Sequence, residues 1–581
     1  MWTLLVLAST ALAQVPLPQP PFLPPNASSG ATPSSSASVP NQQWTTLLGE
    51  LLYFYDEQRS GTLPASNRVS WRNNSAVNDG SDVHLDLSGG FYDAGDYIKC
   101  TFPLSFTVMS ICWGATDFGK GYDLANQTPY LDDTLRWALD WLIKAHSANN
   151  TLYVQIADAN LDNAYWGGDQ NIPQPRPSYQ INATNPGTDA AAGTAAAFAA
   201  CSNLYANRLF GSPFSGPATL QNATYAATLL QHAQQLYSFA SSTPPTLYQN
   251  SVPQAGEAYA SSGYGDELTL AALFLAWATN STQAYNQAQS YWNQYSLAGY
   301  NGVFNWDTKT PAIPILAAQI ANASPTTALG ANLSAWQTEA ERYLDGIVYG
   351  GGNGYLTRGG LLWYDGDSDD ASANPALNAA MLLERYSHIA STPSRQSDYA
   401  SFAHAQVDYV LGNNPMSAPY VVGTNPNAPQ NPHSALAGGS TNITDPAPEA
   451  YVLYGGVVGG PDKYDRYFDL RPDWPEAEVA LDYNAPMLTL AAMHVLNDTS
   501  DPFYTGLGPG AYDARKPSGE PCDAVYDGGC GGPLFFKGAS IAMGVILGLV
   551  GALIGGLLAW WGWLVWPSRR GYRFGPGVDL Y

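Results

Sequence analysis

Helix-length amphipathic runs dominate the middle of the chain, between Trp44 and Thr499. Apolar residues recur every three or four positions in about a dozen runs, whereas strand-like alternation is scarce. Long loops rich in Gly, Pro and Asn join the runs, and no fixed repeat period relates them, which argues against an α-solenoid. The pattern predicts one all-α domain over residues 44–500 whose loops carry its function. Among the clearest runs are Trp44–Arg59, Leu131–His146, Asp189–Leu209, Tyr225–Ser241, Glu267–Ala278, Leu333–Val348, Ala376–Ile389 and Ser397–Leu411.

Both ends of the chain have features of a secreted, membrane-anchored protein. Residues 1–13 form a short apolar run that closes on Ala11-Leu12-Ala13, which predicts a signal peptide. Residues 539–566 contain no charge, exceed the about 20 residues that a spanning helix needs, and precede Arg569. A buried core helix is the alternative. We expect a single-pass protein of the cell surface, with an extracellular body and a cytosolic tail over residues 567–581.

Two segments without apolar periodicity flank the predicted domain. Residues 14–43 are rich in Pro, Ser and Ala, and residues 501–538 contain Gly-Pro clusters. We expect a flexible spacer in the first segment and an extracellular stalk in the second. Glycosylation sequons all precede the predicted span, as the orientation requires: Asn26, Asn73, Asn126, Asn149, Asn182, Asn222, Asn280, Asn322, Asn332, Asn442 and Asn497.

The charge balance and the glycine spacing bear on partners. Lys and Arg total 23 against 47 Asp and Glu, and no stretch is basic enough to follow a phosphate backbone, so nucleic acid is not expected.

Within the predicted span, the pairs Gly544/Gly548 and Gly551/Gly555 have the spacing that lets two helices approach closely. A weak homodimer through this helix is therefore one possibility.

Five cysteines are too few to build the fold from disulfides. Cys522 and Cys530 bracket a Gly-rich turn and are expected to pair. Cys100 and Cys112 either pair or stay as core thiols, and Cys201 is expected to be a buried, free thiol. No cluster of His and Cys has the spacing of a zinc site.

Two distant stretches place acids among glycines and aromatic residues. The first, Gly89 to Asp96, holds two aspartates around a glycine, and the second, Tyr467 to Ala485, interleaves acids with aromatic side chains before a helical run. Opposed carboxyl groups are what acid–base hydrolysis of a glycosidic bond requires. Taken singly, an Asp before a helix is more often a cap or turn residue.

Together these stretches resemble glycoside hydrolase family 9, the inverting endoglucanases. The family's Asp-Ala-Gly-Asp run is present at Asp93 to Asp96. Its second motif is matched by Tyr467, Asp469, Trp474, Glu478, Ala480, Asn484 and Ala485. Further ordered matches span the body: Tyr153 to Gln155, Asp162 to Gly167, Arg176-Pro177, Asn185 to Asp189, Tyr409 to Pro415 and Gly455 to Asp462.

The resemblance implies a fold and a mechanism. The fold is an (α/α)6 barrel with the cleft built from loops at one end, and the reaction is internal hydrolysis of β-1,4-glucan with inversion. Glu478 is the implied general acid, Asp96 the base that activates water, and Asp93 helps to hold that water. In an inverting enzyme these carboxyl groups stand about 6.5 to 9.5 Å apart.

Several residues are implied to bind the sugar chain. Tyr483 and His433 stand where the family keeps residues that face the substrate. Flat sugar faces stack on aromatic rings, so Trp166, Trp363 and Trp474, which lie in predicted loops, are added as candidates.

The resemblance further implies a structural calcium ion but no cofactor for the chemistry. The segment Ser262 to Glu267 resembles the family's calcium loop, with Ser262, Gly263, Asp266 and Glu267 as ligands and Asp307 as the distal ligand. Such oxygen ligands suit calcium. The alternative is that Asp266 and Glu267 only cap a helix.

Departures from the family pattern leave other functions open. The arginine expected two residues after His433 is replaced by Ala435, the histidine expected after Asp162 by Asn163, and an expected glutamate by Gly193. A membrane-tethered glucan-binding pseudoenzyme is one alternative. Another is a family member that acts on mixed-linkage glucan or glucosamine oligomers.

Overall fold

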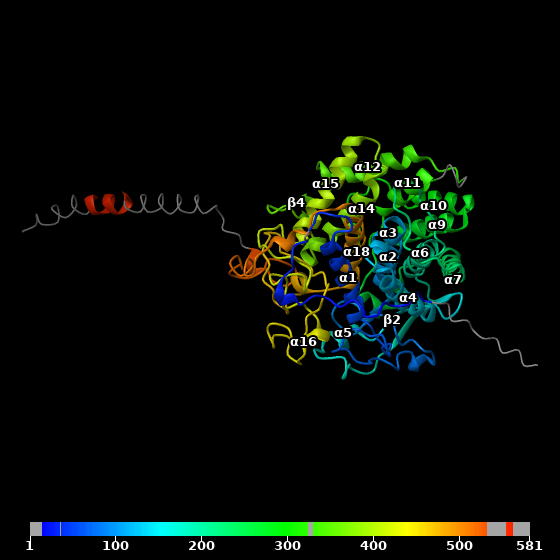
Figure 1. Cartoon of the computed structure of the whole chain (residues 1–581), viewed down its shortest axis with the longest axis horizontal. Coiled ribbons are helices and arrows are strands. Elements are labelled where there is room, and N and C mark those ends of the chain that lie inside the picture. Colours follow the sequence, from blue (N-terminus) through cyan, green and yellow to red (C-terminus); the bar gives the residue numbers. More distant parts are fainter. Residues whose placement is uncertain (1–13, 35, 324–328, 531–552, 562–581) are drawn as a thin grey trace, which may run out of the picture. The chain divides into compact units, whose positions relative to one another are not determined.

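A computed structural model of the 581-residue chain describes residues 14–34, 36–323, 329–530 and 553–561 (Figure 1). The chain divides into two units, Met1–Val525 and Tyr526–Tyr581. The first unit contains every residue predicted for the functional site.

Six helices of the first unit form a closed inner ring (Figure 1). Each of these helices packs against the next in chain order, and the last returns to pack against the first. The ring consists of α2 (Thr101–Asp117), α6 (Thr188–Tyr205), α9 (Gly265–Thr279), α11 (Ala312–Ala323), α14 (Ala373–Ser387) and α18 (Leu481–Asn497).

Six further helices pack outside this ring. They are α1 (Gln42–Glu57), α4 (Thr128–Ala145), α7 (Ala223–Ser242), α10 (Thr282–Gln294), α12 (Leu333–Val348) and α15 (Pro393–Val410). The mostly helical fold is confirmed, and two rings of helices in alternating chain order are consistent with an (α/α)6 barrel.

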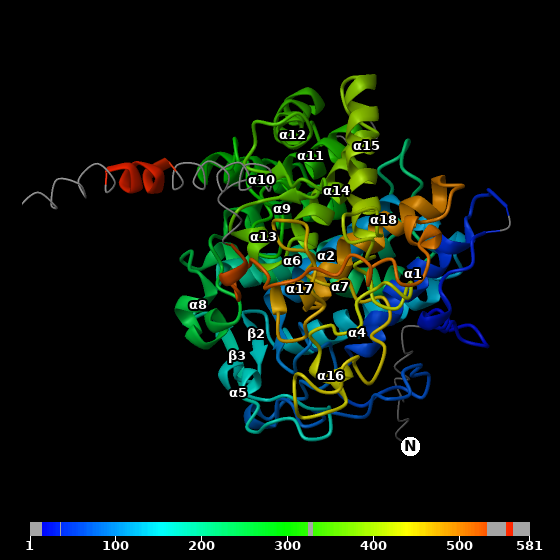
Figure 2. The ribbon, with the colours of Figure 1, turned by 90° about the vertical axis from the view of Figure 1, so that its left-hand side faces the viewer.

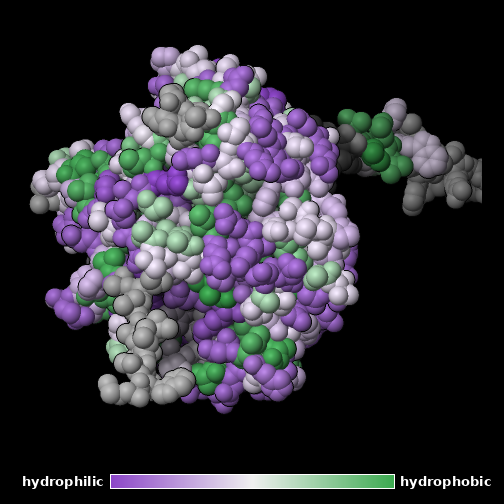
Figure 3. Space-filling model, turned by 90° about the vertical axis from the view of Figure 1, so that its right-hand side faces the viewer, coloured by the Kyte–Doolittle hydropathy of each residue, from purple (hydrophilic) through white to green (hydrophobic). Residues whose placement is uncertain are grey.

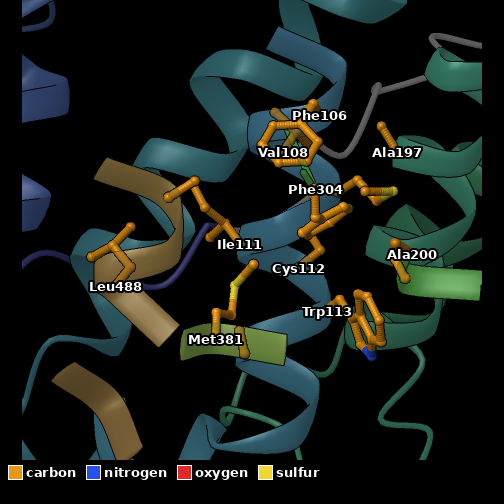
Figure 4. Packing of buried hydrophobic residues seen from close by; sticks show 14 of the residues in the cluster. Phe106, Val108, Ile111, Cys112, Trp113, Ala197, Ala200, Phe304, Met381 and Leu488 are labelled. Carbon is orange, nitrogen blue, oxygen red and sulfur yellow. The ribbon is translucent and has the colours of Figure 1, made fainter. Parts of the chain in front are cut away.

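Side-chain patterning explains which helices are inner and which are outer. The inner helices α2, α6 and α14 are buried at every residue, as expected for sequences in which apolar and small residues predominate on all sides. Figure 4 shows side chains of α2, among them Val108 and Ile111, packed between those of α6, α14 and α18. The outer helix α7 instead buries one stripe at helical spacing: Tyr225, Ala226, Leu229, Ala233, Leu236, Phe239 and Ala240.

Short elements lie in the loops between the long helices. A three-stranded antiparallel sheet has the order β1 (Lys99–Cys100), β2 (Thr151–Ile156), β3 (Ser178–Asn182), and a second sheet pairs β4 (Tyr355–Leu356) with β5 (Leu362–Trp363). The short helices are α3 (Gly119–Leu124), α5 (Ala159–Asn163), α8 (Tyr248–Ser251), α13 (Asp367–Asp370), α16 (Ala435–Gly438) and α17 (Trp474–Ala477). Both views place β2, α5 and α16 at one end of the barrel, as expected for loops that build a cleft (Figures 1 and 2).

The N-terminal segment differs from the flexible spacer predicted over residues 14–43. The Val15 N–H donates to Asp132 Oδ2 at 2.7 Å, and the Phe22 N–H donates to the Tyr130 hydroxyl at 2.6 Å. A Cβ at Gly49 of α1 would lie 2.5 Å from the Phe22 ring, so the glycine makes room for this side chain. Long-range contacts therefore fix a Pro-rich segment whose composition alone favours flexibility.

The predicted stalk over residues 501–538 also differs, as far as Val525. Tyr504 and Tyr512 are buried against the body, and the Tyr512 hydroxyl donates to the carbonyl of Tyr467 at 2.9 Å. Two buried aromatic side chains are enough to dock a segment that lacks apolar periodicity.

The cysteine pairing within the body was predicted wrongly. Cys112 of α2 is bonded to Cys201 of α6, with their Cα atoms 5.0 Å apart, and Cys100 is a buried free thiol. The bond joins neighbouring inner helices whose cysteines are 89 residues apart in sequence, and sequence spacing does not reveal such proximity. The pairing of Cys522 with Cys530 stays a prediction.

The surface of the first unit in Figure 3 is mostly hydrophilic, with apolar residues in small, scattered groups. In the part of the chain that the structure describes, no helix has both the length and the apolar character needed to cross a membrane. The predicted signal peptide, the cytosolic tail and most of the predicted span over 539–566, including three of its four paired glycines, lie outside the described residues.

Candidate active site

The Asp-Ala-Gly-Asp run forms a tight loop that backbone hydrogen bonds hold in place. The Asp93 N–H donates to the carbonyl of Ile98 at 3.1 Å, and the Asp93 carbonyl accepts from the Leu481 N–H at 3.3 Å. Gly95 has φ of 83°, and a Cβ there would lie 2.1 Å from the carbonyl oxygen of His433. Only glycine meets both conditions, which explains its place between the two aspartates.

The segment that starts at His433 connects this loop to the predicted acid. The Ala435 N–H donates to the Gly95 carbonyl at 2.7 Å, and the His433 N–H donates to the carbonyl of Ala477 at 2.7 Å. Glu478 follows directly, pairs with His433 in a parallel bridge, and accepts a hydrogen bond on its carbonyl from the Gly459 N–H at 2.8 Å. Two stretches far apart in the sequence are thus brought to one place.

Glu478 is built to hold a proton. Burial raises the pKa of its carboxyl to about 8, although the Tyr483 hydroxyl, which donates to Oε2 at 3.0 Å, acts in the opposite direction. Since the residue keeps some exposure, the proton remains available to a bound molecule. A carboxyl that stays protonated at neutral pH can serve as a general acid.

Asp93, Asp96 and Asp162 form a second group of neighbouring carboxyls. Burial, followed by the charges of Asp162, Asp93 and Glu478, raises the pKa of Asp96 well above its usual range. The Asp162 carboxyl contacts that of Asp96, and burial also raises the pKa of Asp162. Two such carboxyls can share one proton, which leaves a negative charge on the pair to accept a proton from water. Burial raises the pKa of Asp93 to about 7, and the hydroxyl of Tyr259, which donates to Asp93 Oδ2, opposes this rise.

Four of the five predicted substrate residues lie around these acids. The His433 Nδ1 is 2.7 Å from the carbonyl of Arg471, a partner that only accepts, so Nδ1 carries the proton and Nε2 remains for another group. The Trp166 ring meets His433 edge to face, with centroids 5.1 Å apart. The Tyr483 hydroxyl contacts the Glu478 carboxyl. Trp474 is the first residue of α17, and its backbone carbonyl accepts a hydrogen bond from the Glu478 N–H at 2.9 Å. All four side chains keep some exposure.

Trp363 does not belong to this group. It lies in β5 with 0% of its surface exposed, so a sugar ring has no access to its face. The prediction is wrong because a Gly-rich stretch indicates an exposed loop, whereas Trp363 lies in strand β5, both of whose residues are buried.

The predicted calcium loop is held together by other contacts. The Lys309 ammonium group pairs with the buried Glu267 carboxylate at 2.9 Å, the Lys309 N–H donates to Asp266 Oδ2 at 2.6 Å, and the Ser262 N–H donates to Asp307 Oδ1 at 2.7 Å. The carboxyl groups of Asp266, Glu267 and Asp307 do not form a group with oxygens all within 4.8 Å of one another. Carbonyl and hydroxyl oxygens also ligate calcium, so the predicted site of Ser262, Gly263, Asp266, Glu267 and Asp307 stays a prediction.

Two residues of the site were not predicted as functional. The sequence motifs include Asp162 only within a matched segment and do not predict its contact with Asp96. Tyr259 reaches Asp93 across 166 residues of sequence, and no motif marks it.

Distant loops thus present two groups of acids with raised pKa, flanked by an imidazole and an indole ring. A carboxyl that holds a proton, other carboxyls close to it, and flat rings that can stack on sugar faces together indicate a glycoside hydrolase.

Comparisons with known proteins agree with this class. The model of Glycosyl hydrolase family 9 matches residues 44–491. Endoglucanase 15 of Arabidopsis thaliana is 37% identical over 481 residues, which cover 78% of this chain and 93% of that protein. Endoglucanase A of Bacillus pumilus is 36% identical over 458 residues, covering 78% of this chain and 66% of that protein. The structure of an endoglucanase from the termite Nasutitermes takasagoensis has a TM-score of 0.69 at 34% identity, covering 78% of this chain and 98% of that one.

The chain therefore belongs to glycosyl hydrolase family 9. Its activity is that of an endoglucanase.

Proposed function

We propose that this enzyme cleaves internal β-1,4-glucosidic bonds of cellulose-like glucans with inversion at the anomeric carbon. The observation that carries the proposal is that the loops of Glu478 and Asp96 meet through the segment that starts at His433. Burial also raises the pKa of Glu478 to about 8, as a general acid requires. Endoglucanase CelQ of Clostridium thermocellum, crystallised with cellobiose and cellotriose, has a TM-score of 0.67 to this chain at 27% identity, covering 84% of this chain and 74% of that one. That complex supports a cello-oligosaccharide substrate.

The proposed reaction is a single displacement. Glu478 donates its proton to the leaving glycosidic oxygen while water attacks the anomeric carbon from the opposite face. Asp96 accepts a proton from this water, and Asp93 holds the water in place. Tyr483 orients the acid through its hydrogen bond to Oε2. No covalent intermediate forms, so a β-linked substrate releases an α-configured reducing end.

We also propose that a helix over residues 539–566 anchors the enzyme, with the catalytic domain outside the cell. The support is the uncharged stretch itself, its tryptophan-rich end and the arginines that follow it. Glycine pairs in this helix support a weak homodimer.

Substitution of the acid tests the mechanism. Glu478→Gln keeps the size of the side chain but cannot donate the proton, so hydrolysis of a soluble cellulose derivative should fall by about 100- to 10,000-fold. Glu520→Gln, which changes an exposed glutamate, is the control and should keep full activity. Proton NMR of freshly released product should show the α anomer first. Equal, near-zero rates for wild type and Glu478→Gln, with glucan still bound, would contradict the proposal and indicate a binding protein.

A further inference from the structure

Three carboxyl groups converge at the helix that precedes the catalytic acid. Asp473 directly precedes α17 and Glu476 lies within it. Asp523 belongs to the segment that follows the barrel and packs against it. One oxygen of each lies within 4.8 Å of the others. Across the described ranges, no other group of three or more His, Cys, Asp or Glu residues is this tight.

Two of these acids are buried without matching donors. Asp473 is 0% exposed, and neither of its carboxyl oxygens accepts a hydrogen bond. Glu476 is 1% exposed; its Oε2 accepts from the Phe468 N–H at 2.6 Å, whereas its Oε1 has no partner. Buried carboxyl oxygens without donors are costly unless a further group satisfies them.

Asp473 and Glu476 have no basic partner among the residues that the structure describes. Arg466 binds Asp462 at 2.6 Å, and no ion pair among the described residues includes Asp473 or Glu476. Burial, together with the negative charges of Asp523 and Asp462, raises the pKa of both Asp473 and Glu476. A buried, like-charged group of this kind needs either protons or a cation.

We propose that a calcium ion binds between Asp473, Glu476 and Asp523. Calcium takes oxygen ligands at about 2.3 to 2.6 Å, so ligands on opposite sides of one ion lie about 5 Å apart, close to the spacing of these oxygens. The group contains no His or Cys, which argues against zinc. Carbonyl oxygens and water complete the shell in such sites.

The proposed ion joins the C-terminal segment to the helix that leads to the acid. Asp473 precedes the first residue of α17, and Glu478 follows its last. The segment of Asp523 is already anchored by the Cys522 N–H, which donates to Asp462 Oδ2 at 3.2 Å, and by the Ala524 N–H, which donates to the carbonyl of Asp369 at 3.2 Å. The ion takes no part in hydrolysis; it clamps the docked segment onto α17.

Calcium titration of the full chain tests the site. After metal is removed with a chelator, added calcium should raise the unfolding temperature, and terbium(III) excited through the neighbouring Trp474 should emit on binding. Asp473→Asn and Asp523→Asn should each weaken calcium binding by at least about tenfold, because affinity follows the number of charged ligands. Asp523 is the more exposed of the two, so its variant keeps the test valid if the buried one does not fold.

Two control variants separate this site from other acids. Asp513→Asn removes an exposed acid of the same segment, and Asp307→Asn removes an acid of the loop predicted to bind calcium; both should keep the calcium response. The proposal is overturned if calcium leaves the wild type unchanged, which would mean that protons neutralise the group. It is also overturned if the response survives in Asp473→Asn and Asp523→Asn, whatever Asp307→Asn does.

Discussion

At the residue scale, the hydroxyl group of Tyr259 contacts Asp93, the carboxyl that we propose holds the attacking water. The hydroxyl donates to Asp93 Oδ2, and the Tyr259 ring is itself held edge to face by Trp306, with centroids 4.8 Å apart. Because the hydrogen bond lowers the pKa of Asp93 against the effect of burial, the tyrosine favours the charged carboxylate that a water-holding role requires.

Tyr259→Phe should therefore slow the reaction and move its pH dependence. Without the Tyr259 hydroxyl as donor, the pKa of Asp93 rises further. The part of the kcat–pH profile in which Asp93 loses its proton should therefore shift to higher pH. At a pH below that part of the profile, kcat should fall about 10-fold or more, the effect of a hydrogen bond to a charged group, with little change in KM. Steady-state kinetics from pH 4 to 9 measure both. Tyr264→Phe is the matched control, and an unshifted profile in Tyr259→Phe would show that Tyr259 only packs.

At the scale of elements, Lys309 connects the loop before α11 to the inner helix α9. Its ammonium group pairs with Glu267 at 2.9 Å and lies 4.4 Å from the centroid of the Phe102 ring of α2. Lys309 and Glu267 are both fully buried, so neither charge can be hydrated if the other is removed.

Lys309→Met should lower the free energy of unfolding by about 3 to 5 kcal/mol, because it leaves a buried carboxylate unpaired. The double variant Lys309→Met/Glu267→Gln should recover much of this loss, since the glutamine carries no charge. Urea denaturation of the single and double variants measures the coupling. Additive losses would show that the two side chains stabilise the protein independently.

At the scale of the whole molecule, buried acids make stability depend on pH. Burial raises the pKa of Glu50 to about 8, of Asp93 to about 7, and of Glu478 and Asp482 to about 8. The same groups titrate near 4 in the unfolded chain. Between pH 4 and pH 8 the folded state binds more protons than the unfolded state. The contribution of these groups to the free energy of unfolding is therefore largest below about pH 4 to 5 and falls as the pH rises toward 8.

The unfolding temperature, measured in a chelator, should therefore decrease from pH 5 to pH 8. Each group that still holds its proton contributes a slope of about 1.4 kcal/mol per pH unit. Asp482→Asn should reduce the slope, because the amide does not ionise. Stability that rises over this range would contradict the assignment of protonated, buried carboxyls.

The sequence by itself determined the helical class, most of the long helices and the two acidic motifs. The predicted runs at Leu333–Val348 and Tyr225–Ser241 match α12 and α7 within a residue or two at each end. The match follows because apolar periodicity is a property of contiguous residues. The motifs at Asp93 and Glu478 could be found for the same reason, since each is a short run of residues.

Only the tertiary structure decided which residues meet. The contact of Tyr259 with Asp93, the disulfide between Cys112 and Cys201, and the convergence of Asp473 with Asp523 all join distant parts of the chain. Burial of Trp363, and docking of the Pro-rich and Gly-rich terminal segments, depend on the surfaces that surround them. Such contacts arise from packing between elements, and local patterns along a single chain contain no record of them.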